Sequence, residues 1–329
     1  MGNVLIDIFN HCLPPRYIEA CRSHMDGPMV MFDRAVVLPG MSDLDERRRI
    51  MEGFDGYCQL LSLASPAPES IADPNASPEL VRIGNDCLAE WCEIDPIRFP
   101  GFVASLPMNH PDAAMLEARR AVLELGAVGV QIYTHVNGSP LDQPEYLAVL
   151  EQLAELDCPV WLHPLRPSSQ PDYPDEALSK FDLWWAFGWP HETSVCAGRL
   201  VFSGLFDRYP DMKIITHHAG GTIPMVEGRL ESGLEALGTR YAPEEQQAAE
   251  TPLKETAIKA FRRFHADTAT FGSRLGIDAA EAFFGSERMY FASDFPFAGI
   301  ERSIRAVEGL SNNILQGNAA ALLESVRHG

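Results

Sequence analysis

The sequence predicts an α/β fold: a (β/α)8 TIM barrel with a small inserted hairpin after the first strand and extra C-terminal helices. Strand-like apolar runs and helical patterns alternate eight times, which is typical of a parallel sheet covered by helices. The length of 329 residues fits one large barrel, so we expect a single domain over residues 1–329. An open doubly wound sheet is the alternative, but no Gly-x-Gly-x-x-Gly or Gly-x-x-x-x-Gly-Lys turn follows any strand.

Eight apolar runs, rich in β-branched residues, indicate buried strands. They are Val4–His11, Tyr57–Ala64, Pro100–Pro107, Ala127–Tyr133, Pro159–Leu165, Lys213–His218, Arg263–Ala269 and Met289–Phe295. Helical patterns separate them, and two more helices follow the last strand. The expected helices are Ser77–Ile94, Pro111–Leu125, Gln143–Glu155, His191–Phe206, Gly221–Leu237 with Ala242–Ala260, Ser273–Phe284, Ile300–Gly309 and Asn313–Val326.

Residues 12–42 are expected to form an insertion over the active-site end of the barrel. Two short apolar runs, Met29–Phe32 and Ala35–Leu38, flank the polar pair Asp33-Arg34, which suggests a small hairpin. A helix then begins after Ser42-Asp43, whose side chains suit an N-cap, and runs to about Phe54.

The composition predicts a soluble globular protein with small-molecule partners. Hydrophobic residues make up 46% of the chain and charged residues 22%, while the net charge is −20 and the pI about 4.8. Nucleic acid and anionic membranes need clustered Lys and Arg, so neither is an expected partner. No apolar run of transmembrane length and no secretory signal are visible.

The cysteines indicate a reducing compartment. Seven are scattered along the chain with no Cys-x-x-Cys pair, a number and spacing that fit reduced thiols in a cytoplasmic protein. Cys12 adjoins His11, and a buried apolar role is favoured for it over a role in the site.

Potential metal ligands end four of the predicted strands. The first strand ends at His11, the fifth at His163, the sixth at His217-His218, and the eighth at Asp294. Chemistry in such barrels lies at the C-terminal ends of the strands, so these side chains should meet at a common centre. Two or three neutral imidazoles and one carboxylate suit a divalent metal such as zinc, with a position left open for water or substrate.

Each of these residues has a structural alternative. His163 before Pro164 alone suits a strand cap, and Asp294 suits an N-cap. Because successive strand residues face opposite ways, at most one of His217 and His218 should point at the centre. His265-Ala266-Asp267 and His135 are weaker strand-end candidates.

The set of motifs resembles the metal-dependent amidohydrolase superfamily. It is most similar to the branch typified by aminocarboxymuconate-semialdehyde decarboxylase and γ-resorcylate decarboxylase. The resemblance runs nearly from end to end and is carried by Ile6–Pro14, Ala127–Ile132 with Asn137–Leu141, Leu162-His163-Pro164, Arg199–Gly204, Tyr209-Pro210, His218–Gly221 with Pro224 and Gly228-Arg229, Ser293–Pro296, and Ile314–Ala320.

The resemblance implies a role for each matching residue. His11 and His163 would be metal ligands, and Asp294 a ligand that also exchanges a proton. His218, and not His217, would be the catalytic histidine. Arg229 resembles an arginine that meets a substrate carboxylate, in some relatives across a dimer interface, so a homodimer is expected. Phe9 and Phe295 are expected to border the substrate.

One position departs from the family pattern. The family opens with His-x-His or Glu-x-His, whereas this chain has Phe9-Asn10-His11. Asn10 cannot replace the lost ligand because the strand sends it to the other face. The possible outcomes are a three-ligand site with His218 recruited, a different metal such as Mn, or no metal.

The expected activity is metal-dependent non-oxidative decarboxylation of an aromatic or unsaturated carboxylic acid, with zinc as the first choice of metal. A metal-dependent hydrolase of amides, esters or lactones is the second choice, because the same groups activate water. A metal-free or inactivated binding protein is the third, because of Phe9. Trp184, Trp185, Phe187 and Trp189 suit either an aromatic substrate pocket or packing.

Overall fold

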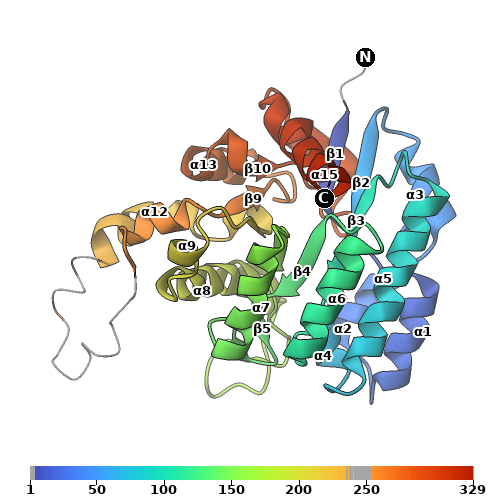
Figure 1. Cartoon of the computed structure of the whole chain (residues 1–329), viewed down its shortest axis with the longest axis horizontal. Helices are drawn as coiled ribbons and strands as arrows, with labels where there is room; N and C mark the ends of the chain where they lie inside the picture. The colour runs from blue at the N-terminus through green and yellow to red at the C-terminus, as the bar shows by residue number, and fades with distance from the viewer. Residues whose placement is uncertain (1–3, 235, 237–239, 241–252, 329) are drawn as a thin grey trace.

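Eight parallel strands form the centre of the computed structural model, which describes residues 4–234, 236, 240 and 253–328 (Figure 1). In sheet order they are β1 (Leu5–Cys12), β2 (Tyr57–Leu63), β3 (Gly101–Ser105), β4 (Gly129–Tyr133), β7 (Val160–His163), β8 (Ile214–Thr216), β9 (His265–Asp267) and β10 (Met289–Tyr290). Backbone bonds from Ile8 N to Phe291 O (3.0 Å) and from Asp294 N to Phe9 O (3.1 Å) join the last strand region to β1. The predicted barrel is confirmed.

Helices surround the strands (Figure 1). The α-helices are α1 (Pro15–His24), α2 (Val30–Ala35), α3 (Leu44–Met51), α4 (Pro68–Ile71), α5 (Ser77–Ile94), α6 (Pro111–Leu123), α7 (Pro144–Glu155), α8 (Trp189–Phe202), α9 (Leu205–Arg208), α12 (Ala257–Phe261), α13 (Arg274–Phe284), α14 (Ile300–Ala306) and α15 (Asn318–His328). Short 3-10 and π turns are η1 (Trp184–Gly188), η2 (His218–Gly220), η3 (Pro224–Val226), η4 (Arg229–Gly233), η6 (Ser286–Arg288) and η7 (Asn313–Gly317). In the described part of the chain, no helix has the length and apolar character needed to cross a bilayer.

Two apolar layers hold the barrel together. The larger lies between helices and strands, and the smaller includes one residue from each of five strands, Ile8, Leu60, Val103, Trp161 and Ile215. The Trp161 indole donates a hydrogen bond to Ile8 O (2.9 Å), so even this large ring leaves no polar atom unpaired.

The insertion after β1 is helical, which corrects the predicted hairpin. Phe32 and Ala35, the buried residues of α2, are three positions apart, which is the spacing of one helix face and not of a strand. A true hairpin occurs at β5 (His135–Val136) and β6 (Ser139–Pro140), where Asn137 and Gly138 adopt positive φ at the turn.

Other helices begin or end at residues that differ from the predicted ones, for local reasons. The helix expected over His191–Phe206 is broken at Gly204, whose φ is 71°, and becomes α8 and α9. The helix expected from Gly221 begins as the short turns η3 and η4, and most of Ala242–Ala260 lies outside the described residues. Asp43 is the N-cap of α3, as predicted, and accepts a hydrogen bond from Glu46 N (2.9 Å).

Gly129 at the start of β4 tests the packing between strands and core. A Cβ there would lie 2.4 Å from Pro159 O and 2.5 Å from the Trp161 ring. We expect Gly129→Ala to destabilise the protein by about 1–3 kcal/mol through overpacking, measured by denaturant unfolding. Gly299→Ala is the matched control, since its Cβ would meet nothing within 4 Å; equal midpoints for the two variants would contradict the prediction.

Candidate active site

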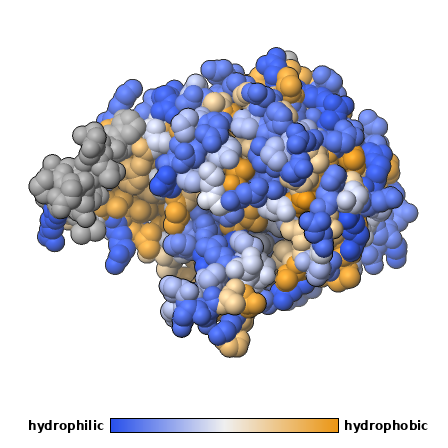
Figure 2. Space-filling view, turned by 90° about the horizontal axis from the view of Figure 1, so that it is seen from below, coloured by the Kyte–Doolittle hydropathy of each residue, from blue (hydrophilic) through white to orange (hydrophobic). Residues whose placement is uncertain are grey.

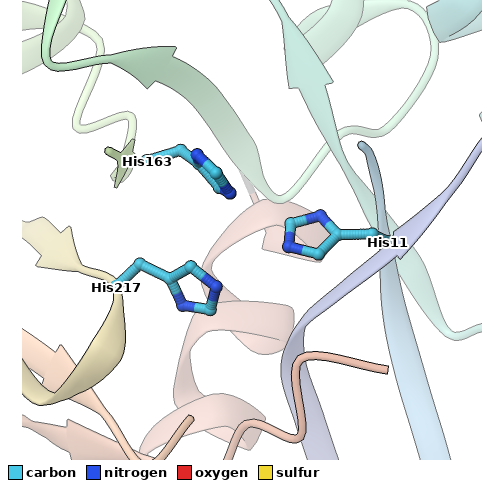
Figure 3. A group of neighbouring side chains, drawn as sticks. All are labelled: His11, His163 and His217. Atoms are coloured by element: carbon cyan, nitrogen blue, oxygen red, sulfur yellow. The ribbon is translucent and has the colours of Figure 1, made fainter. Parts of the chain in front are cut away.

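Four strand ends bring their polar side chains to one buried centre. His11 lies near the end of β1, His163 ends β7, His217 follows β8 and Asp294 follows β10. All four are at most 3% exposed. Figure 3 shows the three imidazoles reaching inward from different strands toward one another. The convergence predicted for strand exits one, five, six and eight is therefore present.

The distances suit shared coordination of an ion. The ligand atoms of His11, His163 and His217 lie within 4.8 Å of one another, as do those of His217, His218 and Asp294. His11 Nε2 is 3.2 Å from Asp294 Oδ1. His163 Nδ1 lies 2.7 Å from Pro164 O, which leaves Nε2 for the centre.

The donor set fits a divalent metal. Among the described residues, the buried Nε2 atoms of His11 and His217 make no well-aligned hydrogen bond, although Asp294 Oδ1 lies 3.2 Å and 3.6 Å away from them. This arrangement costs free energy unless something binds the two nitrogens. Imidazole nitrogens with a carboxylate oxygen are ligands that zinc and other divalent transition metals accept.

Both neighbouring histidines reach the site, which corrects the expectation that only one would. β8 ends at Thr216, and His218 has a φ of 55°, so the strand alternation no longer applies to it. His217 Nε2 lies 3.6 Å from Asp294 Oδ1, and His218 Nε2 lies 3.6 Å from Asp294 Oδ2.

Phe9 lies among the site histidines, where a ligand was expected. Its ring stacks on His217 with centroids 3.8 Å apart, and lies 5.6 Å from His11 and 5.9 Å from His163. Asn10 points elsewhere, as predicted: its side chain bonds Arg47 and the carbonyl of Leu60.

Asp267 at the end of β9 is a site residue that the sequence interpretation rated low. Its Oδ2 bonds His217 Nδ1, and its Oδ1 accepts hydrogen bonds from Ala219 N and Ala269 N, both at 3.0 Å. A carboxylate at a barrel strand exit was the signal available. His265 on the same strand instead lies 3.3 Å from the Tyr290 hydroxyl.

The electrostatics separate the ionisable groups. Burial lowers the pKa of His11, of His163 and of His218, which favours the neutral imidazoles that metals bind. Burial opposes ionisation of Asp294, but its histidine contacts outweigh burial and hold its pKa well below the ordinary value. Burial opposes charge on His217 too, yet Asp267 and Asp294 together raise its pKa to about 9.

A cavity of about 680 Å³ opens beside the centre, and His218 is one of its walls. Trp185, Phe187, Trp189 and Phe271 also line it. The Trp189 ring lies 5.3 Å from His163 and 6.1 Å from His218, so it connects the cavity with the buried histidines. Trp184 instead packs on Trp189 and lines a separate cavity of about 260 Å³. The described surface of Figure 2 is a mosaic of hydrophilic and hydrophobic residues.

Three residues expected to meet the substrate lie outside the lining of this cavity. Phe9 is completely buried beneath His217. The Phe295 ring packs under the Arg47 guanidinium, 4.9 Å away. Arg229 begins η4 and is exposed. A second phenyl ring near His11, beside that of Phe9, belongs to Phe297, with centroids 5.7 Å apart, and the sequence interpretation did not single it out.

A parallel barrel with histidines and an aspartate at its strand exits defines a metal-dependent enzyme of the amidohydrolase type. Residues 52–325 match the family model described as amidohydrolase, and the chain belongs to that family. The predicted resemblance is thereby confirmed.

Relatives of similar length carry decarboxylase names. The chain is 35% identical over 283 residues to the γ-resorcylate decarboxylase of Polaromonas sp. (strain JS666), covering 82% of each chain. A crystal structure of 5-carboxyvanillate decarboxylase from Sphingomonas paucimobilis superposes with a TM-score of 0.85 at 25% identity, over 98% of this chain and 99% of that one. A dihydroxybenzoic acid decarboxylase structure from Polaromonas sp. JS666, with bound manganese and the inhibitor 2-nitroresorcinol, superposes with a TM-score of 0.78 at 28% identity, over 98% and 97%.

Proposed function

We propose that this chain is a carboxy-lyase that catalyses metal-dependent, non-oxidative decarboxylation of an aromatic carboxylic acid with an adjacent ring hydroxyl. The observation that carries the proposal is the cluster of His11, His163 and Asp294 beside an aromatic-walled cavity. The γ-resorcylate and carboxyvanillate decarboxylases named above support the substrate class.

His11, His163 and Asp294 are the residues that we propose to hold the metal. A divalent ion bound there would supply positive charge to the carboxylate and hydroxyl oxygens of the substrate. Manganese is supported by the relative that contains it, and zinc is the metal first expected from the ligand types.

Asp294 is proposed to carry the proton to the ring carbon that bears the carboxylate. Its Oδ2 lies 3.6 Å from His218 Nε2, and His218 lines the cavity, so a proton can pass between the cavity side and this carboxylate. The new C–H bond forms first. The bond to the carboxylate carbon then breaks, its electron pair returns to the ring, and CO₂ leaves.

His218 is proposed to bind the substrate hydroxyl and to stabilise negative charge on that oxygen. Its ring lies between the cavity and Asp294, and its side chain is 13% exposed, which allows contact with a bound molecule. The aromatic ring of the substrate would make stacked or edge-to-face contacts with Trp185, Trp189 and Phe271.

The experiment that tests the function combines metal removal with product analysis. Protein stripped with a chelator and reloaded with Mn²⁺ or Zn²⁺ is incubated with 2,6-dihydroxybenzoate and other hydroxybenzoates, and in parallel with ester and lactone substrates. We expect CO₂ release only from metal-loaded protein, in a 1:1 ratio to the arene formed. Cleavage of esters or lactones without CO₂ release would instead favour the hydrolase, and failure to bind any metal would contradict both.

We also propose a homodimer and a cytoplasmic location. The homodimer agrees with the exposure of Arg229, which a second subunit would have to bring toward a substrate. The cytoplasmic location agrees with seven cysteines that are all free thiols.

A further inference from the structure

We infer that His217 is a metal ligand in this chain and supplies the donor that Phe9 lacks. The inference rests on the proposed metal dependence, but it concerns which residues form the coordination sphere. In the ligand set implied by the family resemblance, His217 had no role.

The Nε2 atom of His217 is placed and left available for coordination. It is completely buried, makes no hydrogen bond with any residue that the structure describes, and lies 3.6 Å from Asp294 Oδ1. It is also one of three ligand atoms, with those of His11 and His163, that lie within 4.8 Å of one another. Figure 3 shows the ring of His217 completing a triangle with the other two imidazoles.

Asp267 fixes the His217 ring in the form that a metal requires. Asp267 Oδ2 bonds Nδ1 of His217, so with a metal bound the one ring proton would lie on Nδ1 and Nε2 would offer its lone pair to the centre. The backbone amides of Ala219 and Ala269 hold Asp267 Oδ1 in turn. A buried histidine with a dedicated carboxylate on its outer nitrogen is the usual arrangement of a metal-ligating imidazole.

Phe9 occupies the place on β1 where the family pattern has a donor, and His217, the residue after β8, lies beside it. The Phe9 ring lies against the His217 ring, 3.8 Å away at an interplanar angle of 17°. It therefore supports the face of the ring and offers no lone pair of its own. A loss of one donor on β1 and a gain of another beside it keep the number of nitrogen donors unchanged.

His217 and His218 then have separate tasks, although their ring centroids are only 3.8 Å apart. His217 is fully buried on the side of His11 and His163, whereas His218 lines the cavity where a substrate would bind. The first belongs to the metal sphere, and the second remains free for the reaction.

The test is the metal affinity of His217→Gln, measured by competition of Mn²⁺ with a fluorescent chelator, together with the visible spectrum of the Co²⁺ form. We expect the Kd for Mn²⁺ to rise by at least about 10–100-fold. Mutating a residue that only hydrogen-bonds a ligand already weakens metal binding by that factor. The Co²⁺ spectrum should also change. His265→Gln, which removes a half-buried imidazole that contacts the Tyr290 hydroxyl, should leave both readouts unchanged.

Asp267→Asn keeps the inference falsifiable if His217→Gln folds poorly, and a double variant tests it further if His217→Gln folds. Asp267→Asn leaves the ligand in place but disturbs its tautomer, and should weaken Mn²⁺ binding by about 10–100-fold. Phe9→His in the His217→Gln background should restore part of the affinity, because it returns a donor to β1. No restoration would contradict the view that the two positions share one coordination place.

The outcomes separate this inference from the proposed function. If His217→Gln and Asp267→Asn fold, release CO₂ and bind Mn²⁺ as the unmodified chain does, His217 is not a ligand and the decarboxylase proposal stands. If the unmodified chain binds no metal, both are overturned.

Discussion

Replacing Asp294 by Asn is expected to lower kcat for decarboxylation by about 10²–10⁴-fold, the usual range for losing a general acid or base. The carboxylate lies 3.2 Å from His11 and 3.6 Å from both His217 and His218, so it is the group that all three imidazoles share. An amide keeps its shape but transfers no proton and binds metal weakly. CO₂ release at saturating metal and substrate measures the effect separately from metal affinity.

Asp278→Asn is the control for this variant. Asp278 pairs with Arg274 at the protein surface, so its loss should change neither kcat nor stability by much. If Asp294→Asn decarboxylated at the rate of the unmodified enzyme, the proton would have to come from another group. Asp294 would then be a ligand alone.

Replacing Arg47 by Ala is expected to destabilise the protein by more than about 3 kcal/mol, because each buried acceptor left without a donor costs about 1–3 kcal/mol. The fully buried guanidinium donates to Gln59 Oε1 (2.7 Å), His11 O (2.8 Å), Gly40 O (3.0 Å) and Asn10 Oδ1 (2.5 Å). These bonds attach α3 to β1 and β2 next to His11, which we propose as a metal ligand. Denaturant unfolding measures the loss.

Arg49→Ala, on the exposed face of the same helix, is the matched control and should change stability by about 0.5 kcal/mol or less. Arg47→Lys should recover little, since a single ammonium group cannot reproduce the planar fork that reaches four acceptors. A fall in stability as small as that of Arg49→Ala would show that the acceptors find other donors.

The barrel was predictable because its signals are local. Alternating apolar runs and amphipathic helices follow from neighbouring residues, and β1, β7 and β8 appeared where the patterns placed them. The insertion failed as a prediction because its apolar runs are short, and six residues of α2 cannot be told from a strand by periodicity alone.

The positions of the residues at the buried centre divide in the same way. His11, His163 and Asp294 were predictable because barrel chemistry lies at strand exits and each of these residues ends or follows an apolar run. The presence of both His217 and His218 at the centre, with Asp267 beside them, was not predictable. It depends on two separate facts of the folded chain. One is the left-handed backbone at His218, and the other is a side-chain contact across 50 residues of sequence.

By itself, then, the sequence determined the barrel, the end of it that carries the chemistry, and three of the residues there. Period-two and period-3.6 patterns are short-range properties, and they encode the elements and their order. Only the tertiary structure decided that both His217 and His218 reach the centre, that Asp267 holds one of them, and that Phe9 supports it. Those outcomes depend on closure of the barrel, which brings β1 within hydrogen-bonding distance of residues far away in the sequence. Asp7, for example, accepts a hydrogen bond from the backbone N–H of Ser293, 286 positions along the chain.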